Sequence, residues 1–411
     1  MNTNNRRNIL ILSFALVVVM LGFGMVIPIF PFYIESLGAS GTELGLLVAT
    51  AALLEFLFAP LWGSISDRTG RKPILLLGML GYALSSLLMG LSTTLAMLFG
   101  SRALSGILSS ATMATTMAYI GDSTSEEERG GGMGWIGAAM GLGVILGPGV
   151  GGLLGQYSLS TPFFIAAAMS LLALLLIAFL VPESLPSQAR RKAEGVRTVQ
   201  LRRLWQALFS PIGVPLFILF LVSFGLANFE AVFGLYAALK FGYGPERVGA
   251  ILSVIGIVTT LGKGALTGPL TRRWGDSLVI KASLLAGSAG FVVLLLANTY
   301  TTILLATAFF ILSKTLLRPA LLSLTSKRAI AGQGVAMGLS NSFMSLGRIL
   351  GPIWAGWIFD VNFNYPYLTG SLILFLGFLI SLVRISQPER EATSAALQPA
   401  PHNPPTEQTH A

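Results

Sequence analysis

Seven charged residues lie inside long apolar stretches of this sequence, and their types and positions make them the first candidates for chemistry. A charge at the centre of a bilayer costs about 2.5–3.5 kcal/mol on insertion scales, so each one needs a reason to be there. A carboxylate in such a stretch can exchange a proton near neutral pH and, once ionised, attracts a cationic solute. The seven residues are Glu55, Arg102, Glu230, Lys263, Lys314, Arg318 and Arg348.

The two carboxylates are candidates for binding both a proton and a substrate, because competition for one group would couple their movements. Glu230 stands in the outer half of its stretch, two residues after Asn228. The alternative for Glu230 is a structural pair with Arg348 or Lys314. Glu55 stands near the middle of its own stretch, and the binding and structural interpretations have equal weight there.

The five bases leave these stretches formally positive, since only two acids accompany them. We expect Lys314, Arg318 and Arg348 to line a central cavity, because exposure to lipid would cost more. Lys263 lies towards one end of its stretch, where a long side chain can extend to water, so we interpret it as structural. The positive balance leaves anionic and zwitterionic substrates open.

Other kinds of chemistry find little support in the sequence. The chain has no cysteine, which excludes disulfides, thiolate nucleophiles and cysteine-based metal sites. Both histidines, His402 and His410, stand in the polar C-terminal segment, so we expect neither a histidine proton relay nor a zinc site. No G-x-x-x-x-G-K-[ST] pattern is present, which argues against an ATP-driven pump. We therefore expect no enzyme activity, no metal and no cofactor, with a proton gradient as the energy source.

The elements that hold these residues are predicted to be membrane-spanning helices. Hydrophobic residues make up 54% of the chain and charged residues 10%, where a soluble domain carries about 25% charged residues. The apolar segments are long enough to cross a hydrocarbon core of about 30 Å, and backbone groups in lipid must be paired within the segment. The predicted spans are 8–34, 44–65, 73–93, 96–121, 131–155, 161–181, 211–237, 247–270, 278–298, 300–323, 333–358 and 366–386.

A polar stretch divides the twelve spans into two groups of six. We predict a bundle over 1–182, a cytoplasmic linker over 183–210, a second bundle over 211–386 and a disordered tail over 387–411. Apolar residues at helical spacing near 201–209 suit a short helix on the membrane surface, with a solvated linker as the alternative. Nineteen Lys and Arg lie at one side of the spans and two at the other, which places both termini in the cytoplasm. The net charge of +9 follows this pattern and indicates no nucleic-acid binding.

The two groups of six spans repeat one another. Residues 142–148 read LGVILGP and residues 346–352 read LGRILGP, an offset of 204 residues. Offsets within one residue of this value relate Gly63 to Gly268 and Tyr33 to Tyr236. Duplicated six-helix halves place a substrate site near the midplane between them, with alternating access by rocking of the halves. The fold class is therefore an all-α membrane protein with twelve helices in two pseudo-symmetric bundles.

The loop after the second span carries a recognisable pattern. Residues 63–72 read GSISDRTGRK, which resembles the G-x-L-x-D-R-x-G-R-[KR] loop of the major facilitator superfamily. The first glycine would permit close helix approach and the second a sharp turn, while the charges would form a conformational gate. The alternative is an ordinary basic loop. The candidate gate residues are Gly63, Asp67, Arg68, Gly70, Arg71 and Asp122. The second-half copy, 268–276, is degenerate and supports the repeat more than a second gate.

The fifth span reads GLGVILGPGVGG over residues 141–152, similar to the antiporter motif G-x-x-x-G-P-x-x-G-G of drug exporters. Glycines let helices touch backbone to backbone, and proline bends a helix. Generic small-residue packing is the alternative. In the family this motif accompanies export, which favours an exporter over an importer. The motif residues are Gly143, Gly147, Pro148, Gly151 and Gly152.

Three further segments resemble the twelve-span drug:proton antiporters. Residues 21–33 resemble their first-helix motif, and 98–106 their R-x-x-x-G motif, which associates Arg102 with proton coupling. Residues 224–230 are similar to the matching helix of quinolone and multidrug efflux transporters of Gram-positive bacteria, in which a glutamate here is implicated in coupling. Those relatives also have an aspartate in helix ten, three residues before Arg-Pro. This chain has Arg318-Pro319 but Thr315 at that position, beside Lys314.

Together these features predict a secondary transporter that exports amphipathic drugs in exchange for protons by alternating access. Its partners would be a small-molecule substrate, protons and the lipid bilayer, with no nucleic acid, and we expect a monomer in the cell membrane. The alternative is a carrier of the same fold for a metabolite such as a sugar, amino acid or organic anion. A membrane protein without transport activity is less favoured, because the chain has no large aqueous domain.

Overall fold

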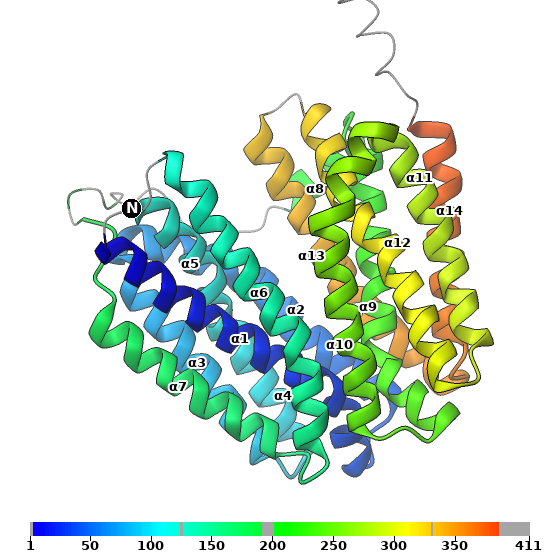
Figure 1. Cartoon of the computed structure of the whole chain (residues 1–411), viewed down its shortest axis with the longest axis horizontal. Helices are drawn as coiled ribbons and strands as arrows, with labels where there is room; N and C mark the ends of the chain where they lie inside the picture. The colour runs from blue at the N-terminus through cyan, green and yellow to red at the C-terminus, as the bar shows by residue number, and fades with distance from the viewer. Residues whose placement is uncertain are drawn as a thin grey trace, which may run out of the picture.

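The structure is a computed structural model that describes residues 3–123, 126–186, 188, 190, 201–329 and 332–385. These residues form long helices and no strand, and the helices make twelve rods in two bundles (Figure 1). The fold class predicted from the apolar segments is confirmed. In the first bundle the elements are α1 (Thr3–Ser36), α2 (Gly41–Thr69), α3 (Arg71–Gly90), α4 (Leu95–Leu104), η1 (Ser105–Ser109), α5 (Ser110–Ser123), α6 (Glu126–Gly155) and α7 (Thr161–Leu180).

A short helix, α8 (Leu201–Leu208), precedes the second bundle. The second bundle contains α9 (Gly213–Phe241), α10 (Pro245–Leu261), η3 (Gly262–Leu266), α11 (Thr267–Leu296), α12 (Tyr300–Lys327), α13 (Gln333–Val361) and α14 (Tyr365–Arg384). Gly275, with φ of 76°, bends α11, so its first turns continue the rod of α10 and its remainder forms the next rod. Only glycine adopts this left-handed conformation without steric cost.

The twelve rods relate simply to the segments of membrane length. Nine segments in the described part of the chain are long and apolar enough to cross a membrane. One of them, Pro245–Leu296, holds 52 residues and is the pair of rods joined at Gly275. Two rods are not among these nine segments. One is α4–η1–α5, which the π-helical turn η1 divides into shorter helices, and the other is α13, which is rich in glycine and serine.

The two bundles meet through close backbone contacts between α2 and α13 and between α6 and α10. A Cβ atom at Gly45 would overlap the carbonyl oxygen of Pro352, and one at Gly249 would overlap that of Pro148. Only glycine permits these approaches. Each residue of the first pair is 204 positions from its counterpart in the second, Gly45 from Gly249 and Pro148 from Pro352. The sequence repeat therefore produces two equivalent contacts between the bundles.

These contacts do not continue to the end of the molecule that carries the Asp67 loop, called the Asp67 end below. A Cβ atom at Gly63 on α2, or at Gly334 or Gly338 on α13, would meet nothing within 4 Å. In Figure 1 the bundles converge at one end and diverge towards the end marked N, where this loop lies. The close helix approach expected at Gly63 is therefore not made in this conformation, because the facing helix belongs to the other bundle and lies away from it.

The linker contributes α8 to the Asp67 end of the second bundle. Leu204 and Ala207 of this helix are buried, whereas Trp205 and Phe209 are 66% and 77% exposed. A helix with one buried apolar edge and exposed aromatic rings suits a membrane interface. Its position on a membrane surface stays a prediction.

Candidate functional site

The charged residues of the apolar stretches do not gather into one cluster; the structure divides them among several helices. One pair spans the two bundles: Arg348 of α13 donates a hydrogen bond from Nη2 to Oε2 of Glu55 on α2 at 3.5 Å. The two side chains are 52% and 47% exposed, so solvent reaches them between the bundles. Glu55 and Arg348 lie just beyond the α2–α13 backbone contact, on the side of the Asp67 end. The pair marks where the contact between the bundles stops.

Glu230 and Lys314 bring a second carboxylate and a second base to this region, from α9 and α12. Glu230 is exposed, and its interacting charges are Lys314 and Arg348. No ion pair joins Glu230 to another described residue, so neither structural pair that the sequence suggested is closed. Lys314 is only 6% exposed, and its Nζ lies 5.0 Å from the centroid of the Phe310 ring. That Nζ has no hydrogen-bond partner among the residues that the structure describes.

Asn228 does not share the position of Glu230. Its side chain is fully buried, and its Nδ2 donates a hydrogen bond to the backbone oxygen of Pro366 on α14 at 2.7 Å. Residues two apart in a helix point to different faces. Asn228 therefore ties α9 to α14, while Glu230 is the exposed residue of the two.

Arg102 lies within the first bundle, on the face of α4 that is turned towards Phe30 of α1. It is 9% exposed, and its guanidinium carbon is 4.9 Å from the centroid of the Phe30 ring. Its electrostatic neighbours are Tyr82 and Glu55. The π-helical segment η1 follows it, and the indole nitrogen of Trp62 donates to the Ile107 carbonyl there at 2.6 Å. Such segments often occur at functional sites.

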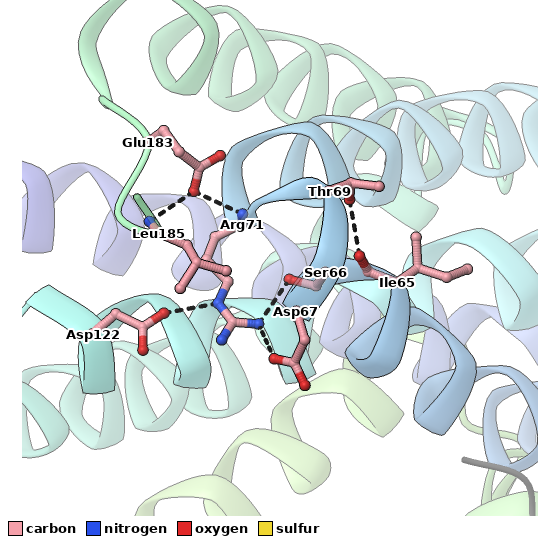
Figure 2. A network of polar contacts seen from close by, with 8 residues as sticks. All are labelled: Ile65, Ser66, Asp67, Thr69, Arg71, Asp122, Glu183 and Leu185. Carbon is pink, nitrogen blue, oxygen red and sulfur yellow. Dashed lines mark hydrogen bonds and ion pairs between the residues drawn. The ribbon is translucent and has the colours of Figure 1, made fainter. Parts of the chain in front are cut away.

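The Asp67 loop forms an ion-pair network whose centre is Arg71 (Figure 2). Arg71 is buried; its Nε contacts Asp122 of α5 at 2.8 Å and its Nη1 contacts Asp67 of α2 at 2.6 Å. The Nη1 atom also donates to the Ser66 hydroxyl at 3.2 Å. Gly70 has φ of 112°, a left-handed conformation that lets the chain turn sharply between α2 and α3. The network thus joins three helices at one end of the bundle.

Glu183 completes this network, and sequence reasoning did not single it out. Its Oε1 accepts the backbone N–H of Arg71 at 2.8 Å and that of Leu185 at 3.0 Å (Figure 2). Its Oε2 accepts the backbone N–H of Lys72 at 3.2 Å. The first N–H groups of a helix lack intrahelical partners, and a carboxylate there also suits the helix dipole. Glu183 therefore caps α3 from the start of the linker. The available signal was an acid directly after the sixth apolar stretch, in a linker that otherwise carries six basic residues and one further acid.

The degenerate copy of the loop holds a network of reversed charge. Asp276, 5% exposed on its side chain, follows Gly275 as Arg71 follows Gly70. Lys327 at the end of α12 contacts its Oδ2 at 2.9 Å, and the Ser323 hydroxyl donates to the same atom at 2.7 Å. The buried residue is an acid here and a base in the first bundle. The sequence predicted the repeat, but not that the exchanged charges would again pair.

The glycines of the fifth-span motif divide between two neighbours of α6. Gly143, Gly147 and Gly151 face α1, where a Cβ atom would overlap Met20, Gly24 and Met25 respectively. Gly152 faces α10 of the other bundle, where a Cβ atom would meet the Pro245 carbonyl oxygen. This second face carries the contact between the bundles, so the motif fixes α6 within its own half while leaving a smooth surface for the other.

Two equivalent bundles of membrane-length helices, with a charge pair between them, define an integral membrane transporter rather than an enzyme. The sequence comparison makes this specific: residues 12–329 and 216–408 match the model of the Major Facilitator Superfamily, and the chain belongs to that family.

Known proteins resemble the chain over nearly its whole length. Multidrug resistance protein 2 of Bacillus subtilis (strain 168) is 33% identical over 383 residues, which are 92% of this chain and 96% of that protein. Quinolone resistance protein NorA of Staphylococcus aureus (strain COL) is 29% identical over 379 residues, with 92% and 96% coverage. Among solved structures, the nucleoside transporter NupG has a TM-score of 0.78 at 16% identity and covers 92% of this chain and 100% of that chain. This structural likeness concerns the fold.

Proposed function

We propose that the chain exports amphipathic drugs from the cell in exchange for protons. The observation that carries the proposal is Glu230, an exposed carboxylate within a helix of membrane length that makes no ion pair with a described residue. A carboxylate left free in such a place can bind either a proton or a cationic group. The relatives named for multidrug and quinolone resistance support drugs as the substrate class.

The exchange uses alternating access. With both termini in the cytoplasm, the Asp67 end opens inward. The cationic part of a drug then displaces the proton from Glu230, and the bundles rock so that the Asp67 end closes and the opposite end opens. A proton from outside displaces the drug, and the protonated carrier returns. Glu55 and Arg348, which join the bundles in the described state, separate or exchange partners during this motion.

The proposal involves no cofactor and no nucleic acid. The proton gradient across the membrane supplies the energy, and one chain in the lipid bilayer acts as a monomer. Arg102 lies among the electrostatic neighbours of Glu55.

Everted membrane vesicles with an acidic interior test the function directly, with accumulation of a cationic fluorescent dye as the measurement. We expect accumulation that a protonophore abolishes, and loss of at least about tenfold in rate for Glu230→Gln, in line with removal of a positioned proton-transfer group. Glu35→Gln is the matched control, since Glu35 is exposed at the end of α1. Transport by Glu230→Gln with unchanged proton dependence would contradict the assignment. Dye entry that needs no proton gradient and stops at equal concentrations on both sides would favour a facilitator of the same fold.

A further inference from the structure

Lys314 is a buried base that the exchange of a proton for a cation does not use. It is 6% exposed, its Nζ has no hydrogen-bond partner in the described part of the chain, and the centroid of the Phe310 ring lies 5.0 Å from that atom. An ammonium group has three donors, and a buried charge without partners is costly. The Lys314 ammonium therefore lacks a partner that a negatively charged ligand group would supply.

Other bases stand beside Lys314 with too few acids to balance them. Arg318, one turn further along α12, is exposed, and its charged neighbours are Arg348 and Lys263, both of the same sign. Residues four apart lie on one face of a helix, so Lys314 and Arg318 face the same way. Like charges repel one another, although water around the exposed Arg318 and Arg348 side chains weakens that repulsion. A negative group placed among them would relieve that repulsion.

The two carboxylates of the region do not supply this balance. Glu55 already pairs with Arg348, and Glu230 interacts with Lys314 and Arg348 but closes no ion pair with either. Arg318 and Lys263 have no hydrogen bond or ion pair with a described residue. Counting only the described side chains named here, four bases face two acids, and the surplus is positive.

We propose that Lys314, Arg318 and Arg348 form a binding site for the carboxylate of an amphipathic zwitterion, an inference that rests on the proposed drug export and specifies its substrate class. Guanidinium groups bind carboxylates through paired hydrogen bonds, and a flexible lysine adds a point charge. The cationic end of the same molecule occupies the position at Glu230. Phe310, whose ring lies 5.0 Å from the Lys314 ammonium, is fully buried and holds the lysine stem against the packed interior of the bundle.

A matched pair of dyes isolates the carboxylate: a xanthene dye that carries a cationic ring system and a free carboxylate, and its methyl ester. The two differ in one charge and have the same aromatic body. Binding to the purified protein in detergent is measured by fluorescence anisotropy. For the unmodified chain we expect the acid to bind about tenfold more tightly than the ester, the scale of one hydrogen bond between charged groups.

Lys314→Met keeps the length and packing of the side chain while it removes the charge. We expect it to reduce the preference for the acid to about twofold or less, with the affinity for the ester unchanged. Lys281→Met makes the same chemical change on α11, outside the group of bases, and should leave the preference intact. Arg318→Gln, at an exposed position, should weaken acid binding in the same direction and decides the matter if Lys314→Met fails to fold.

The outcomes separate this inference from the proposed function. Equal or tighter binding of the ester to the unmodified chain overturns the carboxylate site, as does an undiminished preference in both variants. Export of the ester by everted vesicles without preference for the acid leaves the drug exporter standing and removes the site alone. If neither dye is exported and neither binds, the proposed function fails as well.

Discussion

Arg71 illustrates what a single side chain does at the Asp67 end. Its guanidinium holds Asp67 of α2 and Asp122 of α5, while its backbone N–H is capped by Glu183 from the linker. A base in the first turn of a helix is opposed by the helix dipole, so these carboxylates stabilise a position that would otherwise be unfavourable. Arg71 is thus the residue that joins α2, α3, α5 and the linker at this loop.

Replacing Arg71 by glutamine should lower both stability and transport. Asp67 and Asp122 would lose their common partner. Because their side chains are 34% and 29% exposed, we expect a loss of about 1–2 kcal/mol in the free energy of unfolding. Arg71→Lys keeps the charge but loses the paired donors of the guanidinium group, so its free energy of unfolding should lie between those of the unmodified chain and Arg71→Gln. Thermal unfolding in detergent measures the effect. Arg328→Gln, at the end of α12, is the control, and an equal loss there would contradict the account.

The residue scale also shows where sequence reasoning stops. Glu55, Glu230 and the bases of α12 and α13 were identifiable because a charge in an apolar stretch is rare. The direction of each side chain was not, since it depends on which helix lies opposite: Asn228 turned out to face α14, and Arg348 reaches Glu55 of the other bundle. Glu183 was not predicted because it accepts hydrogen bonds from three backbone N–H groups, and such contacts leave no pattern of residue types in the sequence.

At the scale of the elements, each bundle has an ion pair that joins two helices at the Asp67 end, with the charges reversed between the bundles. Asp276 begins the ninth rod after Gly275, as Arg71 begins α3 after Gly70, and Lys327 takes the place of an acid at the end of the adjoining helix. An acid at a helix N-terminus agrees with the helix dipole, so the second network needs fewer supporting carboxylates. Both bundles thus have an ion pair between two helices at the Asp67 end, and the buried partner is a base in one bundle and an acid in the other.

Charge exchange tests this pairing. Asp276→Lys should destabilise the chain, because two lysines would then face each other and the Ser323 hydrogen bond would lose its acceptor. Adding Lys327→Asp should recover part of the loss, about 0.5–1 kcal/mol, a modest value because Lys327 is 56% exposed. The four unfolding free energies form a double-mutant cycle. Strict additivity of the two changes would show that the contact stabilises nothing.

The rods themselves followed from composition, because a run of about 20 apolar residues has few alternatives in lipid. Their local irregularities did not. The π-helical turn η1 depends on Trp62 of α2 reaching a carbonyl of the neighbouring rod, and the bend at Gly275 depends on the loop being short. Both are consequences of packing between elements that no single segment encodes.

At the scale of the whole molecule, α2 and α13 touch at Gly45 and Pro352 and carry a second pair of glycines, Gly63 and Gly334, that do not touch. Gly63 follows Gly45 by 18 residues and Gly334 precedes Pro352 by 18 residues, and 18 residues make about five turns of α-helix. The two glycines therefore continue the helix faces that meet at Gly45 and Pro352, yet each lies open in the described state. Closure of the Asp67 end would bring the same faces together there. The 204-residue offset predicted the two halves, but only the structure shows that they separate at the Asp67 end.

The central claim is that the Asp67 end opens and closes during transport, and disulfide trapping tests it most directly. The chain has no cysteine, and Gly63→Cys with Gly334→Cys places thiols where added side chains meet nothing. A disulfide needs Cα atoms about 4.4–6.8 Å apart, so it forms only when this end closes.

We predict that an oxidant links the two cysteines in membranes, that the linked protein no longer accumulates dye in everted vesicles, and that a reductant restores accumulation. Gly63→Cys alone should transport normally under both conditions. Full transport by the completely linked protein would contradict the account, because a carrier held shut at one end cannot alternate.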